Sequence, residues 1–175
     1  MYSKIWLSKP HFDNENFDII KKTIVSNWVS TVGPNIASFE TSIERILEHK
    51  AEVVALNSGT SAIHLALKLL EIEPGDEVLC QTFSFCATVN PILYCGATPV
   101  FIESEKETWN MCPFFLEEAI KDRLKKKRKP KAILVVDSYG MPAKWDEILA
   151  ISQKYEIPVI EDAAAALGSR YKGQM

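Results

Sequence analysis

A turn of small residues, residues 57–62, lies between an apolar run and an apolar helical stretch. Gly59 would let the backbone approach a ligand closely. The amide groups of Thr60 and Ser61 would begin the helix and point toward an anion, which suits a phosphate group. The alternative is a plain Ser/Thr cap of the helix. The segment contains no GKS, GKT or GxGxxG, so it is neither a Walker loop nor a dinucleotide fingerprint.

Two aromatic residues, Phe83 and Phe85, follow the next apolar run, within residues 81–88. One of these rings could stack on a flat cofactor. The periodicity by itself favours the alternative, in which both rings are buried in the core.

A carboxylate, Asp162, closes the last apolar run and precedes four alanines, residues 163–166. Among such small neighbours this side chain has little to pair with except a ligand or the next helical turn. Two interpretations therefore remain open for Asp162, a ligand-binding acid and an N-cap.

The elements that must position these groups alternate along the chain. Short apolar runs rich in β-branched residues predict strands at 53–56, 77–80, 98–102, 132–136 and 158–160. Helical periodicity predicts helices at 15–27, 36–49, 61–70, 87–94, 113–124 and 144–155. This alternation predicts the α/β class, with a mainly parallel sheet and flanking helices and without an internal domain boundary. In such a sheet ligands bind beyond the carboxyl ends of the strands, so the three groups should share one edge.

Composition excludes several other classes of function. A net charge of -3 argues against nucleic-acid binding. The four cysteines (Cys80, Cys86, Cys95 and Cys112) show neither CxxC pairing nor metal-ligand spacing, which predicts no metal site and suits a cytoplasmic protein. No apolar stretch approaches the roughly 20 residues of a membrane helix. The basic run at 125–131 is expected on the last turn of a helix and the following loop, rather than as a targeting signal.

The motifs taken together resemble the DegT/DnrJ/EryC1/StrS family of nucleotide-sugar aminotransferases. The resemblance covers nearly the whole chain in the family's order. It is carried by residues 28–34, 57–67, 75–78, 82–85, 87–90, 96–101, 139–143 and 161–164.

This resemblance implies a role for each candidate residue. Thr60 and Ser61, beside Gly59, would bind the phosphate of pyridoxal 5'-phosphate, and Phe85 would stack on the pyridine ring. Asp162 would hold the ring nitrogen and keep it protonated, so that the ring accepts electrons during amino transfer. The resemblance further implies a nucleotide-sugar substrate, glutamate as the amino donor, a role in surface glycan biosynthesis, and a homodimer.

The sequence departs from the family at two places. Ala165 stands where many relatives carry Gln, Glu or His against the phenolic oxygen of the cofactor. The catalytic lysine is expected beyond Met175, so no catalytic residue is assigned within this chain. Residues 1–175 are therefore interpreted as the N-terminal part of the large, cofactor-binding domain of a fold-type I aminotransferase, truncated before that lysine.

Two segments, residues 7–11 and 161–169, resemble the bacillosamine-type subfamily, which suggests a UDP-linked 4-keto-6-deoxy-N-acetylhexosamine as the substrate. Residues 28–34 resemble the segment that shapes the sugar-nucleotide pocket and the dimer contact. Two alternatives stay open: a sugar 3-dehydratase of the same family, which has histidine in place of the lysine, and a non-catalytic fragment. The 175-residue chain alone is expected to show negligible turnover.

Overall fold

The structure, a computed structural model, describes residues 4–6 and 10–175. Its contacts divide the chain into two compact units, one ending at Ala55 and the other beginning at Leu56. The sequence pattern predicts no boundary there, because the junction AEVVAL is apolar and not a Pro- or Gly-rich linker. Residues 7–9, part of the segment with bacillosamine-type resemblance, lie outside the described residues.

The N-terminal unit contains the helices α1 (Asn14–Val25) and α2 (Pro34–Ile46). Asp13 and Asn16 form a capping box at the start of α1, and Asn35 donates a hydrogen bond of 2.6 Å to the Thr23 hydroxyl. Both helices are amphipathic, yet neither contains a buried residue. Their apolar faces therefore remain exposed within the described part of the chain.

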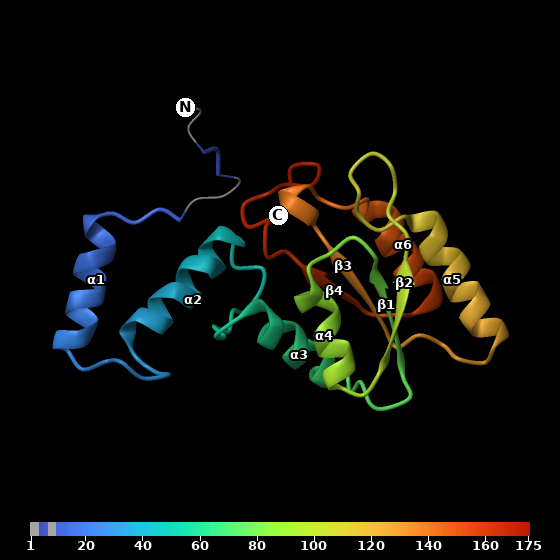
Figure 1. The fold of residues 1–175 in the computed structure, drawn as a ribbon, viewed down its shortest axis with the longest axis horizontal. Helices are drawn as coiled ribbons and strands as arrows, with labels where there is room; N and C mark the ends of the chain where they lie inside the picture. The colour runs from blue at the N-terminus through green and yellow to red at the C-terminus, as the bar shows by residue number, and fades with distance from the viewer. Residues whose placement is uncertain (1–3, 7–9) are drawn as a thin grey trace. The chain divides into compact units, whose positions relative to one another are not determined.

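The second unit is built on a four-stranded parallel sheet of order β2-β1-β3-β4. Its strands are β1 (Glu77–Gln81), β2 (Thr98–Ile102), β3 (Ala132–Val136) and β4 (Val159–Asp162). Figure 1 shows α3 (Gly59–Leu69) and α4 (Cys86–Tyr94) on one face of this sheet, and α5 (Pro113–Lys125) and α6 (Trp145–Tyr155) on the other. Parallel strands need such crossover helices, which explains the alternation in the sequence.

Two apolar clusters fill the layers on either side of the sheet. Successive side chains of a strand point to opposite faces, so Val78 and Cys80 join Leu67 of α3, whereas Leu79 joins Leu116 of α5. β1 and β3, the two central strands, are buried almost throughout. This double burial explains why their sequences are continuous apolar runs.

The predicted strand 53–56 is not a strand in the structure. These residues have no regular secondary structure, and Val54 and Leu56 are exposed. A strand needs a hydrogen-bonded neighbour, and within the described residues the amide of Ala55 instead bonds the Glu40 carboxylate at 2.8 Å. The other four strands and all six helices are confirmed, with bounds shifted by at most three residues.

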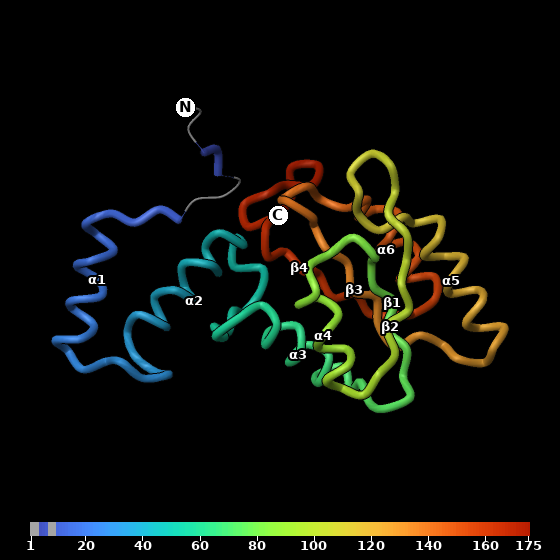
Figure 2. The backbone as a smooth tube through the Cα atoms, viewed as in Figure 1, coloured from blue at the N-terminus to red at the C-terminus, as the bar shows by residue number. Residues whose placement is uncertain are grey.

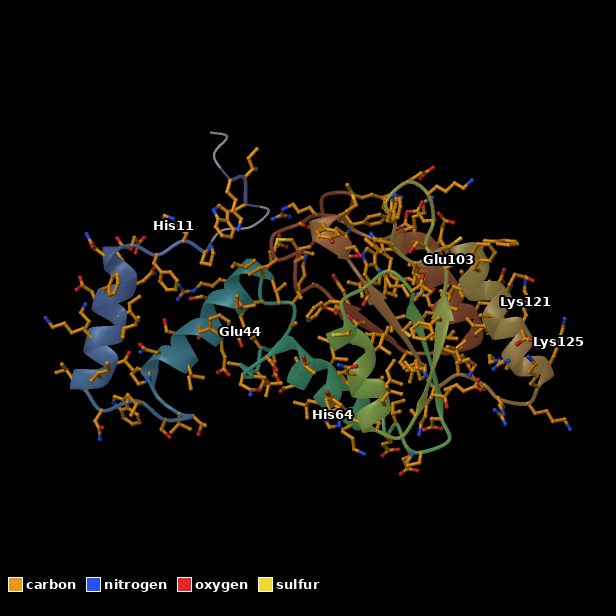
Figure 3. All side chains as sticks on the ribbon, in the orientation of Figure 1. His11, Glu44, His64, Glu103, Lys121 and Lys125 are labelled. Atoms are coloured by element: carbon orange, nitrogen blue, oxygen red, sulfur yellow. The ribbon has the colours of Figure 1, made fainter. Side chains whose placement is uncertain are left out.

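The basic run begins on α5, as expected. Figure 3 shows Lys121 and Lys125 on this helix, which ends at Lys125, and the rest of the run follows in the loop before β3. Arg128 of this loop and Arg123 of the last helical turn both bond the buried Glu77 carboxylate, at 3.5 and 3.3 Å. The run therefore includes a structural contact to the start of the sheet.

None of the helices in the described ranges has the length and apolar character that a bilayer crossing requires.

Candidate functional site

The carboxyl ends of β1, β3 and β4 lie at one edge of the sheet because these strands are parallel and paired in sequence. The register aligns Cys80 with Leu134, and Val136 with Asp162. Figure 2 shows the backbone leaving the sheet at this edge after each strand. The loops that begin there carry Phe85 and the residues that follow Asp162. The expectation of a shared edge is met for these two candidate residues.

Asp162 is the last residue of β4 and is partly buried. Its Oδ2 accepts a hydrogen bond of 2.8 Å from the Thr88 hydroxyl, and its Oδ1 accepts one of 3.2 Å from the Ala164 amide. The bond from Ala164 is a local turn contact and not a helix cap, because residues 164–168 form turns and no described helix follows Asp162. The bond from Thr88 is long-range, and fixes the carboxylate against the start of α4.

Phe83 and Phe85 lie on the loop between β1 and α4, with 40% and 78% of their surfaces exposed. The preference for core burial is therefore wrong. The chain leaves the sheet edge before α4 begins at Cys86, so neither ring enters the layer between sheet and helices. The Phe83 ring packs against Trp109 and Tyr139, with ring centroids 5.5 and 6.2 Å apart.

A pocket of about 370 Å³ opens at this edge of the sheet. Phe85 and Asp162 both line it, together with Thr88, Tyr139 and Ala165. The remaining lining residues are Phe83, Ser84, Val136, Asp137, Ser138 and Ala164. The structure thus brings an exposed aromatic ring and a hydrogen-bonded carboxylate into one cavity.

The segment predicted to bind phosphate does not line this pocket. α3 begins at Gly59, and Ser58 is its N-cap: the Ser58 hydroxyl accepts the Ser61 amide at 3.2 Å. The phosphate interpretation expected a free Ser61 amide. In the structure this amide is bonded to the Ser58 cap, as the capping alternative predicted. A Cβ placed on Gly59 would meet no protein atom within 4 Å, so the backbone there stands open. α3 packs against α4, the helix that follows Phe85.

A buried polar network that the sequence analysis missed holds the loops around the pocket. Gln81 is fully buried; its Nε2 donates to the Phe83 carbonyl and the Ser138 hydroxyl at 2.8 and 3.0 Å, and its Oε1 accepts the Val136 amide at 3.2 Å. Asn110, also fully buried, bonds the Ser138 amide and the Met141 carbonyl at 3.0 and 2.7 Å. Gln81 had a signal, because it is a polar residue directly after an apolar run, as Asp162 is.

The sequence analysis also missed a carboxylate, Asp137, which follows β3 and is buried. It accepts hydrogen bonds from the Ala143 amide at 2.8 Å and from Trp145 Nε1 at 3.3 Å. These bonds fix the loop before α6 to the end of β3. Desolvation raises the pKa of the neighbouring Glu161 carboxyl, and the charge and hydrogen bonding of Asp137 raise this pKa further. The sheet edge therefore carries three carboxyl groups with different surroundings.

Comparison with known proteins identifies the class to which this fold and site belong. The model of the DegT/DnrJ/EryC1/StrS aminotransferase family matches residues 10–175. The chain therefore belongs to this family, as the motifs predicted.

Three similar proteins show the extent of the match. EpsN of Bacillus subtilis, named as a pyridoxal phosphate-dependent aminotransferase, is 48% identical over 174 residues, which are 99% of this chain and 45% of EpsN. A GDP-perosamine synthase of Caulobacter vibrioides is 36% identical over 98% of this chain and 44% of its own length. The solved PLP-form of Spr1654 from Streptococcus pneumoniae, named as a sugar aminotransferase, superimposes with a TM-score of 0.87 at 29% identity, covering 98% of this chain and 46% of that one.

The chain spans about half the length of the curated relatives it matches. The predicted fold class is confirmed: the parallel sheet with flanking helices is part of the fold-type I aminotransferase domain.

Proposed function

We propose that the protein containing this chain is a pyridoxal-phosphate-dependent aminotransferase that transfers an amino group, from glutamate, to a keto group of a nucleotide-linked deoxysugar. The observation that carries the proposal is the shared pocket of Phe85 and Asp162 at the carboxyl edge of the sheet. Small-molecule sites of open parallel sheets occupy this position. Family membership and the names of EpsN and Spr1654 support the reaction class.

The residues of this chain fit a phosphorylated pyridine. Phe85 lines the pocket with an exposed aromatic ring, and Asp162 offers a carboxylate that would hold the protonated ring nitrogen. The open backbone at Gly59 and the Thr60 and Ser61 hydroxyls at the start of α3 would hold the phosphate, where the helix dipole favours an anion. When bound, the cofactor supplies an electron sink for breaking bonds at the amino carbon.

Ala165 lines the pocket with a methyl group only. It therefore offers no hydrogen bond to the phenolic oxygen of the cofactor, and that contact must come from another residue or be missing.

We further propose a UDP-linked 4-keto-6-deoxy-N-acetylhexosamine as the substrate, in a surface glycan pathway, on the motif resemblance of residues 161–169. A homodimer would cover the apolar faces that α1 and α2 leave exposed, which include Phe17, Ile24 and Phe39. The four cysteines are free, which suits the reducing cytoplasm.

The chain alone is proposed to show negligible turnover. It spans less than half of EpsN, and none of its lysines lies in a motif that matches the family's catalytic lysine. A catalytic lysine would carry the proton between cofactor and substrate, and no other group assigned here replaces it.

The test is to read the coding sequence past Met175, express the longer protein with pyridoxal phosphate, and trap the bound cofactor with borohydride for mass spectrometry. A trapped lysine beyond residue 175, with glutamate-dependent amino transfer to the sugar nucleotide, supports the proposal. A histidine at that position, with loss of the sugar 3-hydroxyl, would establish the dehydratase. A stop codon after Met175 would leave a non-catalytic fragment.

Asp162→Asn provides a residue-level test in the same protein. The neutral amide cannot stabilise a protonated ring nitrogen, so we expect cofactor affinity to fall by about tenfold or more. Asp146→Asn, on the exposed surface of α6, is the matched control and should bind the cofactor normally. Equal affinities for the two variants would contradict the role given to Asp162.

A further inference from the structure

Thr88 is a buried hydroxyl residue that reaches the pocket from the first turn of α4. It is 1% exposed, and its Oγ1 donates a hydrogen bond of 2.8 Å to Asp162 Oδ2, across 74 positions of sequence. A buried hydroxyl is costly unless it is bonded, and a valine would fill the same volume without that cost. The hydrogen bond to Asp162 therefore compensates the burial of the Thr88 hydroxyl, and it fixes the positions of both side chains.

The same residue is bonded to the aromatic side of the pocket. The Thr88 amide donates to the Phe85 carbonyl at 3.0 Å, in the turn that starts α4. Thr88 thus contacts the two candidate cofactor-binding residues that line this pocket, Phe85 through its backbone and Asp162 through its side chain. Phe85 and Asp162 otherwise belong to separate segments, the loop before α4 and the end of β4.

Within residues 4–6 and 10–175, the carboxylate has one protein donor on each oxygen. Ala164 bonds Oδ1 from within its own loop, and Thr88 bonds Oδ2 from another element. A carboxylate has about four acceptor positions, so both oxygens keep room for a further donor. Of these two bonds, the one from Thr88 fixes the carboxylate relative to α4 and hence relative to Phe85.

We propose that Thr88 is a positioning residue that aligns the Asp162 carboxylate with the ring stacked on Phe85, and so keeps the pyridine nitrogen of the bound cofactor protonated. This inference rests on the proposed function. It assigns no chemical step to Thr88, which acts through Asp162. The required group is the hydroxyl, so serine should replace threonine and valine should not.

The experiment uses the longer protein, prepared as apoenzyme and reconstituted with pyridoxal phosphate labelled with ¹⁵N in the ring. The ¹⁵N resonance reports whether the ring nitrogen is protonated, and a titration of the apoenzyme gives the cofactor affinity. The variants are Thr88→Val, Thr88→Ser and Asp162→Asn. Thr82→Val is the matched control, because the Thr82 hydroxyl bonds the Ile102 carbonyl and Glu103 outside this pocket.

Thr88→Val is expected to weaken cofactor binding about tenfold or more, as for loss of one bond to a charged group, and to shift the ¹⁵N resonance toward the unprotonated position. Thr88→Ser and Thr82→Val should keep both readouts near wild type. A lost fold in Thr88→Val would also abolish the circular dichroism of the apoenzyme, in which case Thr88→Ser against Thr88→Ala decides the question by the same resonance.

The outcomes separate this inference from the proposed function. If Asp162→Asn leaves the ¹⁵N resonance unchanged, the role of Asp162 fails and the inference fails with it. If Asp162→Asn shifts the resonance but the Thr88 variants without a hydroxyl do not, the proposed function stands and Thr88 is only a packing residue.

Discussion

Gln81→Leu tests whether the buried polar network stabilises the edge of the sheet that carries the pocket. Gln81 is fully buried at the end of β1, and its side-chain amide makes three hydrogen bonds, to the Phe83 carbonyl, the Ser138 hydroxyl and the Val136 amide. Leucine has a similar volume but bonds none of these groups. The substitution removes one partner of each hydrogen bond and leaves the three other groups without that partner.

The expected loss follows from that count. Each hydrogen bond contributes about 1 kcal/mol net, so the loss of three bonds should lower the free energy of unfolding by about 3 kcal/mol, or by more where a partner stays buried without a replacement. The assay is urea unfolding followed by circular dichroism, with an unchanged dependence on urea concentration. Gln153→Leu, on the exposed face of α6, is the matched control and should change stability by less than about 0.5 kcal/mol. If Gln81→Leu unfolds as the control does, the network does not stabilise the sheet edge and the reasoning is wrong.

Two further predictions concern the core and the pH dependence of stability. Leu134→Ala, at a fully buried position of central strand β3, should lower the free energy of unfolding by about 3 kcal/mol in the same urea assay, because the cavity lies between strands and helices that cannot collapse into it; a loss below about 1 kcal/mol would contradict this. Glu161→Gln should change how stability depends on pH, because the folded-state pKa of Glu161 is raised above its ordinary value of 4.5 by burial and then by Asp137. The wild type binds this proton more tightly when folded, so it loses stability as pH rises through the folded-state pKa, whereas the glutamine variant does not. Glu161→Gln should therefore be the more stable protein at neutral pH, and the difference should disappear below pH 4.5. A difference in the free energy of unfolding between the two proteins that stays constant from pH 4 to pH 7 would exclude the effect.

The sequence by itself determined the class of the fold and the order of its elements. The apolar run of β3 was predicted with its observed bounds, because a strand buried on both faces can tolerate few polar residues. The Ser/Thr cap before the helix predicted from Ser61, and the position of Asp162 at the end of a strand, were readable as local signals, since caps and strand ends depend on neighbouring residues. The family motifs also predicted the family that the comparisons confirmed.

Only the tertiary structure decided which of these elements pair and which side chains meet. Residues 53–56 have the composition of a strand but no partner among the described residues, and pairing is a long-range property that composition does not contain. Phe83 and Phe85 were favoured as core residues, yet they are exposed because the loop that carries them lies beyond the sheet edge. The bond between Thr88 and Asp162 joins residues 74 positions apart, and it exists because parallel pairing through β1 and β3 brings α4 to the end of β4.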